Sequence, residues 1–180
     1  MPDLGDELWS DETLGNDELQ AEESRGLSSP LASEESMRIS LASLRRGDGG
    51  LNKRRQSILD RVPDSDTYAS FPLNAIEYKD LAYLSAATND EFALLRGKHE
   101  DILYHGTRFN CHIEDHDILM DALKSHKLRL EIHSHPDVGE ITASLDDRMF
   151  LRGIDQKKSK IISSYTGQIK EFTDNRFEDF

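Results

Sequence analysis

Cysteine is nearly absent from this sequence: its 180 residues include one, Cys111. A single cysteine excludes an internal disulfide framework and a cysteine-rich zinc cluster, so any site chemistry has to come from His, Asp, Glu and Ser side chains. Long apolar runs are absent too. None approaches the roughly 20 residues that a membrane-spanning helix needs, so we expect no membrane span.

Basic residues are in deficit, with 22 Lys and Arg against 35 Asp and Glu and a formal net charge of -13. Nucleic-acid phosphates need clustered basic side chains, so we expect no nucleic-acid partner. The N-terminus MPDLGDELWSDE is acidic and lacks the charged-then-apolar pattern of a secretion signal. We therefore expect a cytoplasmic protein, and delivery to another cell by a route that reads no N-terminal signal stays open.

Residues 1–65 differ in character from the rest. They are acidic up to Glu35 and then turn basic, at Arg45-Arg46 and at Lys53-Arg54-Arg55. Separated blocks of like charge with few apolar residues favour disorder. We predict a disordered tail or linker over residues 1–65 and one folded domain over residues 66–180.

A short motif that occurs twice within this tail has two interpretations. Residues 4–8 (LGDEL) return as LGNDEL at residues 14–19, on either side of Trp9. The motif is too short for a structural repeat. Either it belongs to a solvated tail, or it is a pair of partner-binding motifs.

The remaining residues alternate between helical and strand-like patterns. Helical periodicity marks residues 75–87, 115–125 and 145–155, the last capped by Ser144 with Asp147 in capping-box spacing. Strand patterns mark residues 91–97, 101–106, 128–135 and a hairpin over 160–172, with 111–113 as a short addition. This order predicts an α+β (mixed α/β) domain with a central sheet flanked by helices.

Two histidines, His133 and His135, end the strand predicted at residues 128–135. Residues i and i+2 of a strand project to the same side, so the two imidazoles could bind one metal ion. A third ligand from the next helix, such as Asp147, would complete a zinc site with an open position. The His-x-His pattern alone is weak, because histidines at strand ends more often bond to loop carbonyls.

The run HSHP followed by S-x-x-D resembles the motif of the JAMM (MPN) zinc metallopeptidases, in which two His and one Asp hold zinc. Members of that family also carry a glutamate on an earlier strand, in contexts similar to EFALLRG at residues 91–97. Glu91 lies about forty residues before His133, as in prokaryotic JAB-domain members. The resemblance covers the globular part, from about residue 73 to 172.

The resemblance implies a set of roles. His133, His135 and Asp147 would be the Zn²⁺ ligands, and Glu91 would be the base that moves a proton from water to the leaving amine. Ser144 would help to stabilise the oxyanion. The substrate backbone would lie beside the strand edge near Glu91 and add a strand to the sheet.

One spacing departs from the family pattern. Eight residues rather than seven separate His135 from Ser144, and strict spacing would put Asp146 at the ligand position. A one-residue insertion in the loop at residues 136–140 restores both Ser144 and Asp147, so we prefer Asp147 and keep Asp146 as the alternative.

Other candidate side chains have plainer readings. We expect His112 and His116 to be surface or capping residues, and His99 and His105 to be solvated. Nothing in the sequence places Cys111 near His133, so we expect a buried apolar thiol rather than a nucleophile.

The function expected from the resemblance is that of a zinc-dependent peptidase or isopeptidase. It would cleave an amide bond in a protein or peptide substrate, such as a ubiquitin-like conjugate or a neighbouring polypeptide segment. Family versions of this size occur in bacterial polymorphic toxin and Rhs-type proteins, which suggests a processing or effector module. The alternatives are a catalytically inactive MPN-like scaffold that binds partners, or a protein whose acidic tail is the functional part.

Overall fold

The computed structural model describes residues 30–137 and 141–175. Chain contacts divide the protein into two units, Met1–Ser36 and Met37–Phe180. Helix α2 (Pro30–Arg46) crosses this boundary, and every other described element belongs to the second unit.

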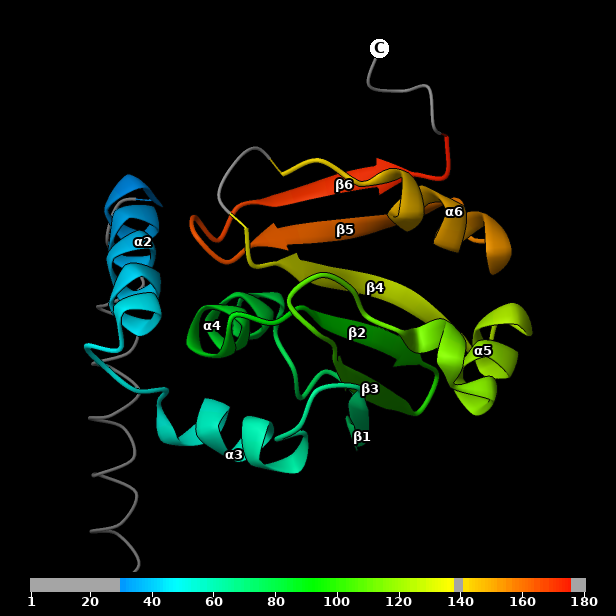
Figure 1. Ribbon diagram of the computed structural model, residues 1–180, viewed down its shortest axis with the longest axis horizontal. Coiled ribbons are helices and arrows are strands. Elements are labelled where there is room, and N and C mark those ends of the chain that lie inside the picture. Colours follow the sequence, from blue (N-terminus) through cyan, green and yellow to red (C-terminus); the bar gives the residue numbers. More distant parts are fainter. Residues whose placement is uncertain (1–29, 138–140, 176–180) are drawn as a thin grey trace, which may run out of the picture. The chain divides into compact units, whose positions relative to one another are not determined.

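A six-stranded mixed sheet forms the centre of the second unit, in the order β1-β3-β2-β4-β5-β6 (Figure 1). Its strands are β1 (Thr67–Pro72), β2 (Phe92–Gly97), β3 (Glu100–His105), β4 (Leu128–His135), β5 (Lys158–Ser163) and β6 (Ile169–Thr173). Only β4 and β5 run parallel; the other neighbouring strands are antiparallel. The free edges of the sheet are therefore β1 and β6.

Helices cover both faces of this sheet. Leu41 of α2, α3 (Lys53–Arg61) and α4 (Tyr78–Thr88) pack on one face, around Phe92 and Leu94 of β2. The short 3-10 helix η1 (Ile113–Asp115), α5 (Asp117–Lys124) and α6 (Leu145–Gly153) pack on the other face. The expected α+β architecture, a central sheet flanked by helices, is confirmed.

Most expected elements have counterparts close to their expected positions. The strand pair β2–β3, the strand β4, the helices α4, α5 and α6 and the β5–β6 hairpin all form. The expected short strand at residues 111–113 is wrong, because Ile113 starts η1 instead. Strand β1 was not anticipated, since TYASFP contains no Val, Ile or Leu, in contrast to the strands that were expected.

The expected disorder up to residue 65 is wrong for its described part. Residues 30–65 contain α2 and α3, and Leu41, Ile58 and Val62 are buried in the core. The few apolar residues among the charge blocks, such as Leu41, Ile58 and Val62, are enough to pack these helices into the same core as α4. Residues 1–29 lie outside the described part of the chain.

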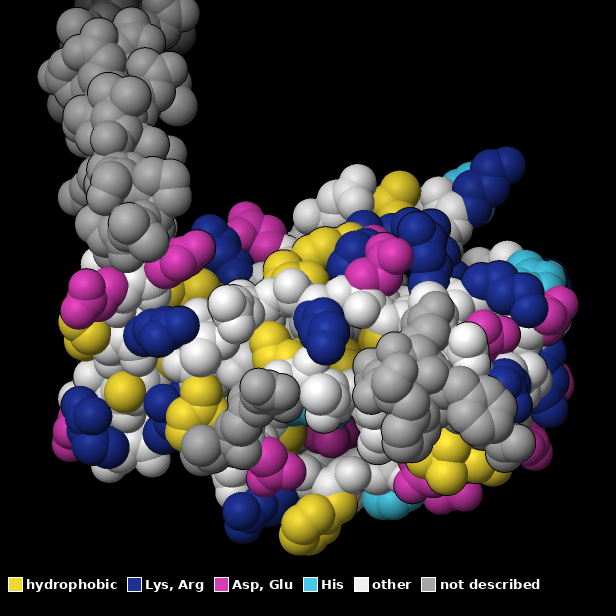
Figure 2. Space-filling model, turned by 90° about the horizontal axis from the view of Figure 1, so that it is seen from above, with side chains coloured by type: hydrophobic (Ala, Val, Ile, Leu, Met, Phe, Trp, Pro, Cys, Tyr) yellow, Lys and Arg dark blue, Asp and Glu magenta, His cyan; other side chains and the backbone are white. Residues whose placement is uncertain are grey.

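Charges of both signs are mixed over the molecular surface. Figure 2 shows a face on which Lys and Arg side chains stand among Asp, Glu and hydrophobic ones. Within residues 30–137 and 141–175, no helix is both long and apolar enough to cross a membrane.

A single β-bulge interrupts β4. The register against β2 shifts between Leu94 and Leu95, which leaves Glu131 as an extra residue without a partner. The buried Glu131 carboxylate accepts a hydrogen bond from Tyr78 Oη and lies among three cationic side chains: Arg129 (2.7 Å), Arg96 (3.4 Å) and Lys160 (3.6 Å). Burial alone would raise the pKa of Glu131, but this bond and these charges hold it below its usual range.

The bulge decides which face the end of β4 presents to α6. An extra residue shifts the alternation of side chains by one position. Leu130 before the bulge and His133 after it consequently lie on the same face and line the same cavity. Strict alternation would have put residues 130 and 133 on opposite faces.

A buried carboxylate attaches α3 to α4. Asp80 is fully buried and binds Arg54 (Nη2–Oδ2 2.6 Å) and Arg55 (Nε–Oδ1 2.9 Å), and it accepts the Glu77 backbone N–H at 2.8 Å. Burial alone would raise the pKa of Asp80, but these hydrogen bonds and the Arg54 charge lower it below its ordinary value of 3.8.

Asp80→Asn should therefore destabilise the fold. We expect the free energy of unfolding at pH 7 to fall by about 2–4 kcal/mol, because the charge-assisted bonds from two arginines to a buried carboxylate are lost. A carboxyl whose pKa is depressed on folding stabilises the protein above its unfolded pKa and loses that effect as the pH falls. Urea unfolding should show the difference from wild type shrinking below about pH 4.

The matched control is Asp48→Asn, which removes an exposed pair with Arg46. That change should cost less than about 1 kcal/mol. Equal effects of the two substitutions would mean that Asp80 does not anchor α3.

Candidate metal centre

The end of β4 places two imidazoles beside the start of β2. His133 lies opposite Ala93 in the register, and residues opposite each other share a face, as do residues two apart on one strand. His133, His135, Ala93 and Glu91, just ahead of β2, are thus directed to the face that carries α6.

Asp147 comes to the same place from the first turn of α6. Ser144 is the N-cap: its Oγ accepts the Asp147 backbone N–H at 3.0 Å, and Asp147 Oδ2 accepts the Ser144 backbone N–H at 2.8 Å. This capping box fixes the Asp147 side chain as part of the helix start. The helix therefore cannot form in this way without directing this carboxylate toward β4.

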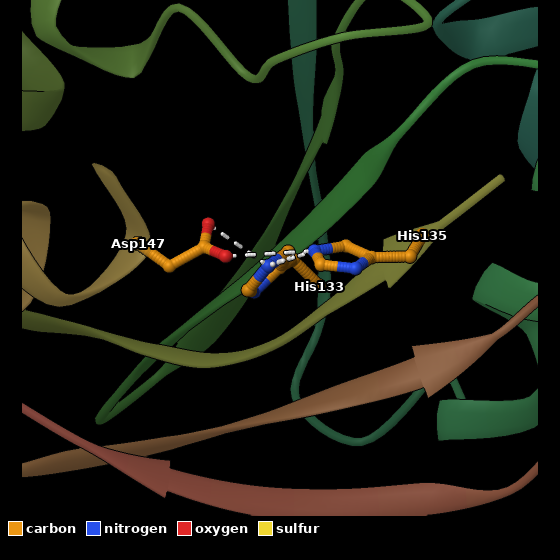
Figure 3. A group of neighbouring side chains, drawn as sticks. All are labelled: His133, His135 and Asp147. Carbon is orange, nitrogen blue, oxygen red and sulfur yellow. Dashed lines mark hydrogen bonds and ion pairs between the residues drawn. The ribbon is translucent and has the colours of Figure 1, made fainter. Parts of the chain in front are cut away.

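The three side chains converge on one point (Figure 3). The Nε2 atoms of His133 and His135 are 3.0 Å apart, and they lie 3.2 Å and 3.6 Å from Asp147 Oδ1 and Oδ2 respectively. One donor atom from each residue lies within 4.8 Å of the others. A tetrahedral zinc ion with ligand bonds of about 2.0–2.1 Å has donors about 3.3 Å apart, so the spacing and the N,N,O donor set fit Zn²⁺.

Electrostatics also suit a cation at this point. Burial alone would raise the pKa of Asp147, but hydrogen bonds with both imidazoles hold it well below its usual range. Burial alone would lower the pKa of His135, but Asp147 and Glu91 raise it above 6.5. The site thus attracts a positive charge, either a proton or a metal ion.

The His133 ring is held by packing on one side and by its Nε2 contacts with His135 and Asp147 on the other. The ring meets Phe172 edge to face, with centroids 5.6 Å apart. Its other nitrogen, Nδ1, is buried without a hydrogen-bond partner in the described part of the chain. Histidine ligands usually donate that second N–H to an acceptor, so this site lacks one common support.

Glu91 lies at the wall of a cavity of about 340 Å³ that His133 and Asp147 also line. Burial raises the pKa of Glu91 to about 8; the charge of His135 opposes the rise, and Asp147 and Asp137 add to it. A bound divalent cation would lower this pKa again. The cavity thus holds two carboxyl groups with opposite pKa shifts, Glu91 raised and Asp147 lowered, and such perturbed groups are typical of functional sites.

Backbone hydrogen bonds to the segment after β3 hold Glu91 in place, and the next residue, Phe92, is bonded from the β4 side. Its N–H bonds to Thr107 O (2.9 Å), and its C=O accepts the Gly106 N–H (2.8 Å). On the other side, Ser134 Oγ accepts the Phe92 N–H at 2.9 Å. The expected addition of a substrate strand beside Glu91 is therefore wrong, because β2 is paired with β3 and β4 and has no free edge.

His105 is buried, so the expectation of a solvated side chain is wrong. Its Nδ1 lies 2.7 Å from Val62 O, its Nε2 lies 2.9 Å from Asp90 Oδ2, and its ring stacks on Phe92. It braces the turn that precedes Glu91. No spacing signal in the sequence links residues 90 and 105, which meet only through the β2–β3 pairing.

His112 and His116 bond to residues near β1. His112 Nδ1 lies 3.1 Å from Asp66 Oδ1, and His116 Nε2 lies 2.9 Å from Tyr104 Oη. Neither belongs to the group of potential metal-binding side chains identified among the described residues.

Cys111 lines the same cavity as His133, a proximity that nothing in the sequence indicated. Burial raises the pKa of its thiol well above the ordinary value, and the charges of Glu91 and Asp147 add to this. A thiol that stays protonated is a poor nucleophile. Ala93 was missed as well; its small side chain leaves the cavity open in front of His133.

The remaining alternatives at α6 are also resolved in space. Asp147, not Asp146, joins the two histidines, although Asp146 lines the cavity. Ser144 is exposed and adjacent to Asp147. Residues 138–140 of the loop expected to absorb the extra residue lie outside the described part of the chain.

Comparison of this chain with protein-family models, curated proteins and solved structures finds no match.

Zinc binding should depend on all three ligands. We expect His133→Ala, His135→Ala and Asp147→Asn each to weaken Zn²⁺ binding by more than about 100-fold, because even outer-shell changes cost about 10–100-fold. Competition with a chromophoric chelator measures this. Asp146→Asn is the matched control and should bind as wild type; equal loss in this variant would contradict the ligand set.

The affinity for zinc should fall as the pH is lowered. Both imidazoles must be unprotonated to bind the ion, and the pKa of His135 lies above 6.5 in the metal-free protein. The loss should therefore begin above pH 6.5 and approach about tenfold per pH unit for each proton displaced. Titration calorimetry in two buffers of different ionisation enthalpy counts the released protons, and constant affinity between pH 6 and 7.5 would contradict the expectation.

Proposed function

We propose that this chain is a zinc-dependent hydrolase of amide bonds in proteins, with a domain of MPN (JAMM) type. The observation that carries the proposal is the grouping of His133, His135 and Asp147, two of which, His133 and Asp147, line one cavity together with Glu91. Two His and one carboxylate leave one coordination position of a tetrahedral ion open, as in catalytic rather than structural zinc sites.

His133, His135 and Asp147 would hold the ion. When bound, Zn²⁺ would supply a Lewis acid that polarises a carbonyl and lowers the pKa of water to about 7. The three protein side chains fix its position, because β4 and the capped start of α6 hold them before any ion arrives.

Glu91 would move the proton. Its carboxylate lines the cavity and forms no hydrogen bond or ion pair with another side chain of residues 30–137 or 141–175. A carboxylate that is half buried and free in this way can take a proton from the attacking water and pass it to the leaving nitrogen. Backbone hydrogen bonds to Gly106 and Thr107 keep it at the cavity wall.

Ser144 would assist at the oxyanion. Its Oγ already accepts the Asp147 backbone N–H, so the hydroxyl hydrogen remains available for donation. A donor fixed at a helix start costs little reorganisation when negative charge develops on the carbonyl oxygen.

The substrate class that suits this site is a polypeptide. Ala93, Ile113, Leu130, Met149 and Phe150 give the cavity apolar walls beside the carboxylates. The resemblance suggests a ubiquitin-like conjugate or a neighbouring polypeptide segment, as in toxin-type processing modules. The substrate would enter from the α6 side, because β2 offers no free edge.

One observation favours a second function, that of a non-catalytic scaffold. His133 Nδ1 lacks the acceptor that usually supports a zinc ligand. A scaffold would use the same fold to bind partners and would show no hydrolysis even with zinc bound.

Glu91→Gln separates these functions. We expect this variant to bind zinc as tightly as wild type but to lose at least about 100-fold in kcat, because the proton carrier is gone. The assay is cleavage of a peptide library and a panel of ubiquitin-like conjugates, with metal content measured on the same samples.

Glu114→Gln is the matched control, since Glu114 lines the same cavity but is exposed. It should retain activity. A fully active Glu91→Gln protein would remove the proposed mechanism, and an inactive wild type with stoichiometric zinc would support the scaffold.

A further inference from the structure

A second, larger hollow lies at the other end of the sheet. It measures about 850 Å³ and is bordered by the β2–β3 turn, the start of β4, α5 and the β1–β3 pair. The end of β2 at Gly97 and the start of β4 at Leu128 border it, whereas Glu91 just precedes the other end of β2 and His135 ends β4. Strands β2 and β4 are neighbours in the sheet (Figure 1). We call it the distal groove; the proposed active site does not use it.

The floor of the distal groove is apolar and open to solvent. Tyr68 of β1 and Ile102 of β3 belong to it, together with Leu73 after β1 and Ile118 of α5. Ile118 is 76% exposed, Leu73 40% and Tyr68 37%. Grouped exposed apolar side chains of this kind mark interaction sites more often than single ones do.

The rim of the groove is basic although the chain as a whole is acidic. Lys98 and Lys127 are exposed and form no ion pair with any residue in the described ranges. Arg96 and Arg129 also line the groove but already pair with buried acids. The acidic lining residue, Glu100, accepts a hydrogen bond from Ser70.

One segment of this chain matches the groove in charge and in apolar content. Residues 3–23 contain nine Asp and Glu and no Lys or Arg, with Leu4, Leu8, Leu14 and Leu19 spaced among them. We propose that the distal groove binds residues 3–23 of a second copy of this chain. Carboxylates would pair with Lys98 and Lys127, and leucines would cover the floor.

The attachment point of the segment favours a second copy. Met37, the first residue of the second unit, packs on Gly167 in the β5–β6 turn. This turn follows Ser163, which pairs with His135. Met37, at which the second unit begins, therefore lies at the His135 end of the sheet, whereas the groove lies at the end of Gly97 and Leu128.

Net charge does not forbid this association. Each chain carries a formal charge of -13, so two copies repel at long range. At physiological salt, exposed charges separated by more than about 8 Å are largely screened. Contacts between carboxylates and two lysines at close range then outweigh the distant repulsion and give the association its specificity.

The first test uses a fluorescent peptide of residues 3–23 titrated with the full chain. We expect saturable binding that weakens as salt is raised. The double variant Lys98→Glu/Lys127→Glu should weaken it by at least about tenfold, because attraction becomes repulsion. A peptide with its four leucines replaced by serine should also bind at least about tenfold more weakly.

The matched control is Lys53→Glu/Lys170→Glu, which makes the same charge change on exposed lysines outside the groove. It should bind the peptide within about twofold of wild type. Equal weakening by both double variants, or displacement of the peptide by a DNA oligonucleotide of equal charge, would overturn the proposal.

The second test is self-association of the full chain by sedimentation. We expect the average mass to rise above 20.5 kDa with concentration, and to return to it in Lys98→Glu/Lys127→Glu or with excess peptide. A chain that stays monomeric at concentrations that saturate the peptide site would overturn the second copy as the occupant. Neither test depends on hydrolysis, so the proposed function stands or falls separately.

Discussion

The pairing of β2 with β4, bulged at Glu131, is the constraint on which the rest depends. It brings Glu91 beside a strand end forty residues later in the chain and turns His133 to the face that α6 covers. A buried carboxylate surrounded by three cationic side chains and a tyrosine hydroxyl occupies the bulge. The local cost of an unpaired strand residue is thereby offset by charge-assisted bonds. These bonds stabilise the bulge, and the bulge sets the face of the sheet on which His133 lies.

Asp147 belongs both to the capping box of α6 and to the candidate metal centre. One of its oxygens closes the capping box of α6 with Ser144, and both approach the histidines. Helix start and donor geometry are therefore formed together, which means that the site is organised by folding rather than by a ligand. Ser134, which lies between the two histidines on β4, also has a structural contact near the site: its Oγ accepts the backbone N–H of Phe92, the residue after Glu91.

Patterns between residues close in sequence predicted much of the fold and the candidate metal-binding side chains. Alternation and capping patterns found β4, α5, α6 and the last hairpin, because such features depend on residues close in sequence. The helices before residue 65 were missed because dense charge masked the few buried positions, such as Leu41 and Ile58. The burial of His105 and the cavity position of Cys111 were missed because their partners come from other strands and loops. Sequence spacing allowed either Asp146 or Asp147 as the third donor. Only the position of each residue around α6 showed that Asp147 faces the two histidines.

By itself, the sequence determined which donors exist and that two of them share one side of a strand end, since a strand's period of two residues is a local property. It also determined that the chemistry cannot depend on cysteine pairs. The tertiary structure alone decided which face that strand end presents, which acid meets it, and how far Glu91 is withdrawn from water. These depend on a strand register and a bulge that are set by packing between segments far apart in the chain.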